Sequence, residues 1–296
     1  MRFLICSDGT DPADNPTRLG AVFAGACKAD VTLLAIAEEP GDDQPLRAAI
    51  ESEAEMLRNA RLAPELVIRH GEPIHQILEQ THSASYDLVV IGAPRKRTSG
   101  LYWRAERTYE AIKAIPVPVV VATGGRETIK RIIVCTGGKR YIEDAVQLTG
   151  RLAQAMNATV TLLHVMAEPP AIYAGMMRLE EDLDALLASG SELGRNLTSQ
   201  KKALEQLGVT VQIRVRHGLV LDQIFAEVAA ADVDLIVTGS SRAGGPLRHY
   251  IMGDVTREVV NRASVPVLVA RPGASAGSAT SLWATIKRAF SSSSAG

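Results

Sequence analysis

The stretch HGEPIHQIL at residues 70–78, followed by DLVVIG at residues 87–92, decides the fold of this chain because it occurs twice. Residues 217–225 read HGLVLDQIF and residues 234–239 read DLIVTG, so the same block returns 147 residues later. Self-similarity at a fixed spacing indicates that one structural unit has been repeated. We therefore interpret the 296-residue chain as two copies of one domain.

The register of the repeat continues on both sides of this block. VTLL occurs at residues 31–34 and 160–163, an offset of 129 residues, and VPV occurs at residues 117–119 and 265–267, an offset of 148 residues. Because the offset grows from 129 to 147 before the His-Gly block, the second copy carries 18 extra residues between its second and third predicted strands.

The repeat predicts one domain over residues 1–123, a second over residues 130–271 and a flexible tail over residues 272–296. The tail contains SLWATIKRAF, a short amphipathic segment that either docks on a partner or membrane surface or is disordered. The extra residues of the second copy, around residues 172–190, contain a leucine stripe. This stripe either packs on its own domain or forms a lid or a partner surface.

Each copy alternates short apolar runs with amphipathic stretches. In the first copy the runs are residues 3–6, 31–37, 65–69, 88–91 and 119–121. Nearly continuous apolar runs are typical of parallel strands covered on both faces, and the stretches between them carry apolar residues at helical spacing. The alternation predicts an α/β fold of two tandem doubly wound parallel-sheet domains. Such sheets bind ligands beyond the carboxyl ends of their strands.

Composition narrows the function classes. The formal net charge is −1, so no basic surplus indicates nucleic acid as a partner. Cys6, Cys27 and Cys135 are too few and too widely spaced for a disulfide framework or a zinc site. No apolar run reaches the roughly 18 residues of a membrane span, and the first residues lack a signal-peptide layout. We expect a cytoplasmic protein without a transmembrane segment or a bound metal.

Several segments resemble the universal stress protein family. They are ICSDGT at residues 5–10, LLHVMAEPP at 162–170, the repeated His-Gly block, and the closing strands PVPVVVA at 116–122 and VPVLVA at 265–270. The resemblance covers both copies, and the chain is identified as a tandem member. It implies Rossmann-like, five-stranded sheets with the strand order 3-2-1-4-5.

Dimers of this family form through the closing edge strand, and the chain has two such strands. We therefore predict that residues 119–121 and 267–269 pair antiparallel across a pseudo-two-fold axis. The chain would then be an intramolecular pseudo-dimer. Further association into a homo-oligomer stays open.

ATP-binding members of the family carry the motif G-x2-G-x9-G-[S/T] after strand four. Its glycines let backbone N–H groups approach the phosphates, and its last pair opens a helix whose N-terminus attracts anions. The first copy keeps the spacing but not the residues. Gly92 is in place, Arg95 replaces the second glycine, and Ala105-Glu106 replaces the closing pair.

The second copy retains more of this motif. It has Gly239, Arg242 and, after one extra residue, Gly253-Asp254, with Gly244 and Gly245 inside the loop. Both copies thus place an acid where the family has a phosphate-contacting hydroxyl. Such a carboxylate stabilises the helix dipole by roughly 0.3–1 kcal/mol but repels a triphosphate.

The resemblance divides the remainder of a nucleotide site between the copies. The first-strand acid that lies against the adenosine in the family is Asp8 in the first copy and Gly137 in the second. Ile36 and Val165 occupy matched places in the second strand, and we expect them, with Thr238, to line the base pockets. Phosphate-like anions should prefer the second copy.

Two turns have open interpretations. Arg95, Lys96 and Arg97 either clamp a phosphate or form a solvated basic loop. Residues 136–139, with the sequence TGGK, form either an anion nest or a tight turn that needs glycine.

No nucleophile, general base or metal cluster has catalytic spacing, so we expect a non-enzymatic stress-response regulator. Its expected ligand is ATP, another adenine nucleotide or a related phosphorylated molecule, and we expect a protein partner whose identity the sequence does not reveal. The alternative is an interaction or scaffold protein whose pockets are vestigial. Nucleotide recovered from the purified protein would discriminate between the two.

Overall fold

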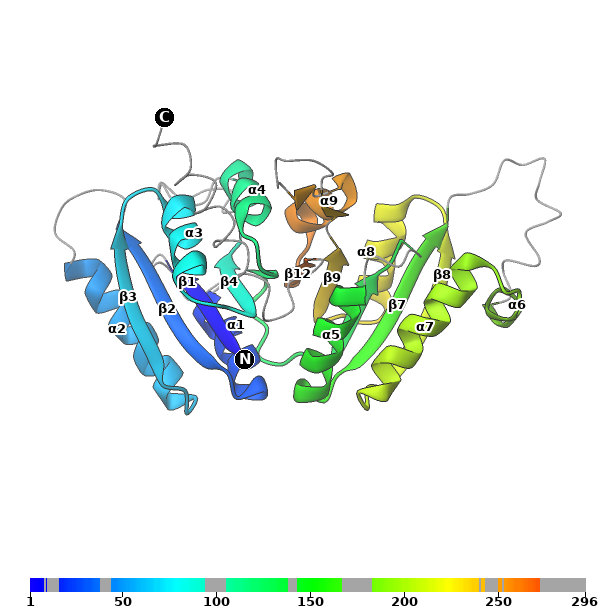
Figure 1. The fold of residues 1–296 in the computed structure, drawn as a ribbon, viewed down its shortest axis with the longest axis horizontal. Coiled ribbons are helices and arrows are strands. Elements are labelled where there is room, and N and C mark those ends of the chain that lie inside the picture. The colour runs from blue at the N-terminus through cyan, green and yellow to red at the C-terminus, as the bar shows by residue number, and fades with distance from the viewer. Residues whose placement is uncertain are drawn as a thin grey trace, which may run out of the picture.

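The computed structural model describes residues 1–7, 9, 16–37, 44–93, 105–137, 143–166, 183–239, 241–242, 250–251 and 253–271. In this part of the chain ten strands form one sheet, in the order β3-β2-β1-β4-β5-β12-β9-β6-β7-β8. Figure 1 shows the first half, in blue through cyan to blue-green, beside the second half, in green to orange. The predicted α/β fold is confirmed.

The first half alternates strands and helices from end to end. Its elements are β1 (Arg2–Ser7), α1 (Pro16–Cys27), β2 (Asp30–Ala37), α2 (Gln44–Asn59), β3 (Pro64–His70), α3 (Pro73–Ser83), β4 (Leu88–Gly92), α4 (Ala105–Ala114) and β5 (Val119–Ala122). All of its strand pairs are parallel, in the order 3-2-1-4-5 that the family resemblance implies.

The second half repeats this plan with additions. Its elements are β6 (Arg131–Cys135), α5 (Glu143–Met156), β7 (Thr159–Met166), α6 (Leu183–Ala188), α7 (Glu192–Gln206), β8 (Val211–His217), α8 (Val220–Ala230), β9 (Leu235–Gly239), β10 (Ser241–Arg242), β11 (Tyr250–Ile251), α9 (Asp254–Arg262) and β12 (Val267–Ala270). Strands β8, β7, β6, β9 and β12 take the places of β3, β2, β1, β4 and β5. The doubly wound order therefore holds in both halves.

The two halves join through their closing strands. Strand β5 pairs antiparallel with β12, with Val119 opposite Val269, Val120 opposite Leu268 and Val121 opposite Val267. The predicted pseudo-dimer is thus confirmed in its pairing and in its register. Each closing strand is satisfied by the other, so neither leaves an open sheet edge at the junction.

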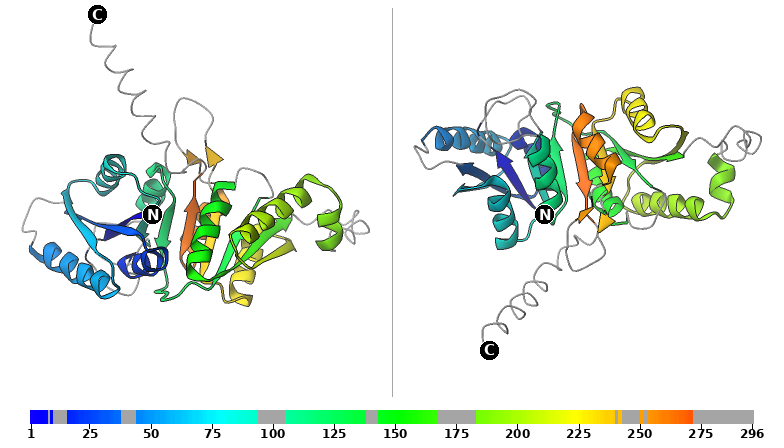
Figure 2. Two further views of the ribbon diagram at one scale, coloured as in Figure 1. Left: turned by 60° about the horizontal axis from the view of Figure 1, so that its bottom comes forward. Right: turned by 90° about the horizontal axis from the view of Figure 1, so that it is seen from above.

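Strand side chains alternate between two apolar cores. Phe3 and Ile5 belong to the first core, which packs against α1, α2, α5 and α7, whereas Leu4 and Cys6 belong to the second core, which packs against α3, α4, α8 and α9. Figure 2 shows helices on both sides of the sheet in each half. Burial on both faces explains why the strand sequences are apolar almost throughout.

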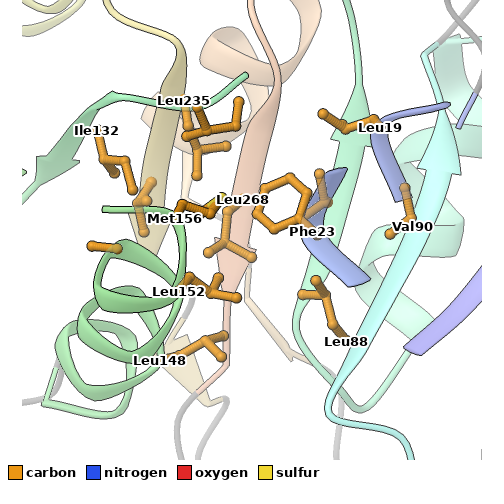
Figure 3. Packing of buried hydrophobic residues seen from close by; sticks show 14 of the residues in the cluster. Leu19, Phe23, Leu88, Val90, Ile132, Leu148, Leu152, Met156, Leu235 and Leu268 are labelled. Carbon is orange, nitrogen blue, oxygen red and sulfur yellow. The ribbon is translucent and has the colours of Figure 1, made fainter. Parts of the chain in front are cut away.

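The first core runs without a break from one half to the other. In Figure 3, Phe23 of α1 lies beside Leu268 of β12, and Leu152 and Met156 of α5 lie on the far side of Leu268. Phe23, Leu152 and Leu268 are each 0% exposed. The junction is therefore part of the hydrophobic core and not a polar contact between separate domains.

The connection between the halves is fixed against the second half. Gly124 has a φ of +72°, and a Cβ there would lie 2.3 Å from the carbonyl oxygen of Ser264. Nearby, Nη1 of Arg126 lies 3.2 Å from Oδ1 of Asp234, which also accepts hydrogen bonds from the backbone of Lys130 and Arg131 through Oδ2. Only glycine fits the first of these positions.

Part of the extra segment of the second half packs on its own domain. Leu186 of α6 is buried, and Leu183 and Leu187 pack against the first core. The rest of the segment before residue 183 and the tail at residues 272–296 lie outside the described residues, so the predictions for a lid and a docking tail stay predictions. None of the helices in the described part is long and apolar enough to cross a membrane.

Candidate functional site

The carboxyl end of β9 carries a buried hydroxyl. Thr238 is 2% exposed, and its Oγ1 has no hydrogen-bond partner within the described part of the chain. The equivalent residue of the first half is the apolar Ile91. A buried hydroxyl without a partner costs about 1–3 kcal/mol of stability. Thr238 is therefore a buried hydrogen-bonding group that has no partner among the described residues.

The residue after Thr238 is tied to helix α9. Oγ1 of Thr256 donates a hydrogen bond to the carbonyl oxygen of Gly239 over 3.1 Å, and Thr256 is itself buried. Because α9 begins at Asp254, this bond joins the end of β9 to the first turn of the helix. The strand end and the helix start form one fixed corner.

Helix α9 begins without a side-chain cap. Gly253 is the N-cap residue in an extended backbone conformation, and no side-chain cap hydrogen bond is made there. A Cβ on Gly253 would meet no atom within 4 Å, so the space at the helix start is open. Uncapped N–H groups at the positive end of a helix dipole attract anions. Asp254, which follows and is exposed, places a negative charge at the same end.

A short hairpin precedes this helix. Strands β10 and β11 pair antiparallel, which sets the backbone of Arg242 opposite Tyr250. The glycines of this segment predict an open loop, and the pairing is not evident from them. Gly244 and Gly245 lie outside the described residues, as does the side chain of Arg242, so their predicted phosphate contacts stay predictions.

A thiol stands between the two residues predicted to line the base pocket. Strand β6 lies between β9 and β7, and Cys135 at its end belongs to the same core as Val165 of β7. Ile236 of β9 also belongs to that core, so Thr238, two residues later, points to the same face. Burial raises the pKa of the Cys135 thiol to about 12. The row of Thr238, Cys135 and Val165 is therefore neutral and mostly apolar.

The residue of the first half that matches Val165 is more deeply buried. Ile36, the equivalent of Val165, is 4% exposed and packs in the second core, whereas Val165 is only partly buried. Gly92 at the end of β4 is partly exposed. Asp8 and Arg95 lie outside the described residues, and so does the side chain of Glu106, so the structure does not bring them into a described site.

Ser7 and Gly9, the residues on either side of Asp8, are linked to a buried acid. Oγ of Ser7 and Oγ1 of Thr17 donate hydrogen bonds to the two carboxylate oxygens of Glu53, over 2.6 and 2.5 Å, and Glu53 is 7% exposed. The backbone N–H of Gly9 donates to Oγ of Ser7 over 3.1 Å. Sequence patterns do not reveal this cluster because Glu53 is 46 residues from Ser7.

The matching turn of the second half is built differently. Gly137 is exposed, and Nδ1 of His164 lies 2.9 Å from the carbonyl oxygen of the preceding Thr136. Residues 138–140 are not described, so the choice between an anion nest and a tight turn stays open. Among the described residues, no three His, Cys, Asp or Glu side chains gather as metal ligands.

The structure thus unites four of the predicted residues at one corner, namely Thr238, Gly239, Gly253 and Asp254. Val165 lies on the same face of the sheet, two strands away from Thr238. The chemistry of this corner is that of a buried hydroxyl beside an open helix N-terminus. It can hold a neutral polar group next to a group of limited negative charge.

Comparison with known proteins gives the same fold over nearly the whole chain. The model of the universal stress protein family matches residues 1–123 and 128–271. A universal stress protein from Archaeoglobus fulgidus is 15% identical, with 92% of this chain and 98% of that chain covered at a TM-score of 0.63. A putative universal stress protein from Pseudomonas aeruginosa is 17% identical, with 92% and 93% covered at a TM-score of 0.65. None of the curated proteins matches the sequence.

Proposed function

The chain belongs to the universal stress protein family as a tandem, two-domain member, and on this basis we propose that it is a non-catalytic regulator that binds an adenine nucleotide in its second half. The observation that carries this proposal is the buried hydroxyl of Thr238 beside the uncapped start of α9. A nucleoside would supply the hydrogen-bond partner that Thr238 lacks among the described residues. A phosphate would be held by the N–H groups after Gly253.

The charge at the corner limits how many phosphates the ligand carries. The helix start contributes the equivalent of about half a positive charge, and Asp254 contributes a full negative charge at the same place. Every further phosphate therefore meets more repulsion than attraction. We propose that AMP or a ligand of similar charge binds more tightly than ATP.

We propose that the first half binds no nucleotide. Its base-lining residue, Ile36, is closed off in the core, and Ile91 replaces the hydroxyl of Thr238. A nucleotide would gain no buried hydrogen bond there. We accordingly propose one ligand for each chain.

We propose that the protein is not an enzyme because the sequence shows no nucleophile or general base at catalytic spacing and because of the state of two thiols. Burial raises the pKa of both Cys6 and Cys135, so these thiols stay protonated and are poor nucleophiles near neutral pH. All three cysteines are free, in keeping with the reducing cytoplasm that we propose as the location.

The test is titration calorimetry of the full chain with AMP, ADP and ATP, alongside analysis of nucleotide released on denaturation. We expect about one AMP for each chain and weaker binding of ATP. Thr238→Val has nearly the same shape but lacks the hydroxyl, so it should weaken AMP binding without lowering the melting temperature. Ile91→Val is the matched control in the first half. Failure of all three nucleotides to bind would overturn the proposal.

A second candidate, a protein-binding scaffold, is favoured by one feature of α8. Leu219 and Val220 at its start are 74% and 38% exposed, whereas Glu72 and Pro73 occupy the matched places in the first half. Oε2 of Glu72 accepts a hydrogen bond from the N–H of His75 over 2.8 Å, so the polar cap has been exchanged for an exposed apolar pair. If no nucleotide binds and Leu219→Glu abolishes capture of a protein from the source cell, the scaffold function is the better description.

A further inference from the structure

The pseudo-two-fold axis passes between two residues that are each other's equivalents. Val120 and Leu268 correspond in the repeat, with an offset of 148 residues, and they lie opposite one another in the β5–β12 ladder. In a symmetric homodimer such positions hold identical residues, because the axis carries each residue onto its own copy. Here they differ.

A second equivalent pair meets on the α4 and α9 side of the sheet. Tyr109 of α4 and Arg257 of α9 also correspond with an offset of 148 residues. The guanidinium carbon of Arg257 lies 5.3 Å from the centre of the Tyr109 ring, which is a cation–π contact. Two copies of the second half would instead bring two arginines together with no ring between them.

A third equivalent pair flanks the axis on the opposite side of the sheet. Phe23 of α1 corresponds to Leu152 of α5, with an offset of 129 residues, and both are 0% exposed within the shared core. The larger ring of the first half lies against Leu268, the larger of the two residues on the axis (Figure 3). Two first halves would set two phenylalanines beside two valines, and two second halves would set two leucines beside two leucines, so neither like pair reproduces the packing of this core.

We propose that the junction is heterospecific: the first half accepts the second half of the chain and rejects a second copy of itself, and likewise for the second half. Tyr109, Arg257, Phe23 and Leu152 are the residues that set this preference. The partner that fits each closing strand is therefore the other repeat. Each chain has one first half and one second half. If two first halves cannot pair, the second halves of the same two chains are also left to pair with first halves.

Substitutions in the full chain can place the same residue on both sides of the axis, as the pairing of two identical halves would. Lys113 also contacts the Tyr109 ring, with its Nζ 5.1 Å from the ring centre, so the variants are built on Lys113→Asn, which copies Asn261 of the second half. In that background Tyr109→Arg sets two arginines together, as two second halves would, and Arg257→Tyr sets two tyrosines together, as two first halves would. The exchange variant Tyr109→Arg/Arg257→Tyr restores an unlike pair in the reverse order. Tyr109→Leu is the control that removes the ring without adding charge.

Thermal unfolding of these full-chain variants is the measurement. Tyr109→Arg should melt about 2 °C below Tyr109→Leu, and added salt should narrow that difference because it screens like charges. The exchange variant should regain most of what Tyr109→Arg loses. Arg262→Tyr removes a second described cation–π contact of α9, in which the guanidinium carbon of Arg262 lies 4.9 Å from the centre of the Phe225 ring. This variant should show no coupling to Tyr109→Arg.

The buried pair supplies an independent arm. Phe23→Leu and Leu152→Phe should each lower the melting temperature, and the double exchange should be more stable than the sum of the two single effects predicts. The proposal is overturned if neither exchange variant is more stable than the sum of its two single effects predicts. Rescue by either exchange supports it.

Discussion

The Nε–H of Arg216 donates a hydrogen bond to Oε2 of Glu227 over 2.6 Å, and the two residues occupy the places that Arg69 and Gln80 hold in the first half. In both halves an arginine on the edge strand is bonded to a buried side chain of the following helix. One half uses a carboxylate and the other uses an amide. We call this hydrogen bond between the edge-strand arginine and the helix the latch. Both repeats have it, but its acceptor is charged only in the second repeat.

This latch predicts the outcome of two substitutions at one position. Glu227→Gln copies the first half and should change the free energy of unfolding by less than about 1 kcal/mol. Glu227→Leu leaves the Arg216 guanidinium without its carboxylate and should cost about 1–3 kcal/mol, as Arg216 remains partly exposed to water. Urea unfolding of both variants is the measurement. Equal losses would show that the hydrogen bond to Arg216 is not what the buried side chain contributes.

The acid at the start of α9 predicts a gain of function. Asp254→Ser removes the negative charge from the helix start and should tighten ATP binding about tenfold if about 1.4 kcal/mol is recovered. AMP, with less charge near the helix, should gain less. Titration calorimetry with both nucleotides measures the two effects. Glu106→Ser, the equivalent change in the first half, is the control and should leave both affinities unchanged.

The buried thiols predict how stability depends on alkaline pH. The pKa of Cys135 rises from 9.0 to about 12, so the thiol ionises more readily in the unfolded chain than in the folded one. Its contribution to stability is full below about pH 9 and is lost as the pH rises toward 12. The melting temperature of Cys135→Ala should therefore fall less steeply than that of the wild type between about pH 8.5 and about pH 10.5. Cys27→Ala should flatten this fall less, because the charges of the N-terminus and Arg151 offset part of the rise that burial gives the pKa of Cys27.

The connection between the halves predicts a steric effect beyond backbone strain. Gly124 and Gly190 both have positive φ, but a Cβ at Gly124 would lie 2.3 Å from a carbonyl oxygen, whereas one at Gly190 would meet nothing within 4 Å. Gly190→Ala should thus cost only the conformational strain, roughly 1 kcal/mol. Gly124→Ala should cost more than this. Equal melting temperatures for the two variants would mean that the backbone around Gly124 can shift away from the Ser264 carbonyl at little cost.

The anchored turn of the first half predicts a local effect. Glu53 accepts hydrogen bonds from Ser7 and Thr17 at a buried site, so Glu53→Leu should lower the free energy of unfolding by about 2–3 kcal/mol. Glu53→Gln, the residue that the second half has at the matched position 200, should retain part of the cluster. Hydrogen exchange at the amide of Gly9, which donates to Ser7, would report the loosening of the turn.

Much of this architecture can be predicted from sequence because it follows from periodicity. In the first half each apolar run matches its strand to within one residue at either end, and the pairing of β5 with β12 follows from the repeat and the family resemblance. Thr238 and Gly253 can each be placed from sequence, because Thr238 lies at the carboxyl end of β9 and Gly253 lies at the start of the helix that follows.

The remaining parts depend on contacts that no local pattern encodes. The Ser7–Glu53–Thr17 cluster joins residues 36 and 46 positions apart, and the row of Thr238, Cys135 and Val165 comes from three strands that meet only in the folded sheet. The β10–β11 pairing runs through a segment whose glycines favour a loop. In each case tertiary contacts overrode or completed the local signal.

The position of Val120 and Leu268 on the axis has a genetic consequence. In a homodimer one codon specifies the residue on both sides of the axis. A single mutation there therefore changes both residues of the contact at the same time. In this chain separate codons specify Val120 and Leu268, and a change on one side can be answered later on the other. Because the repeats are fused, the two sides of the junction can change one at a time, which is not possible in a homodimer. For the same reason, one half can lose a function that the other half keeps.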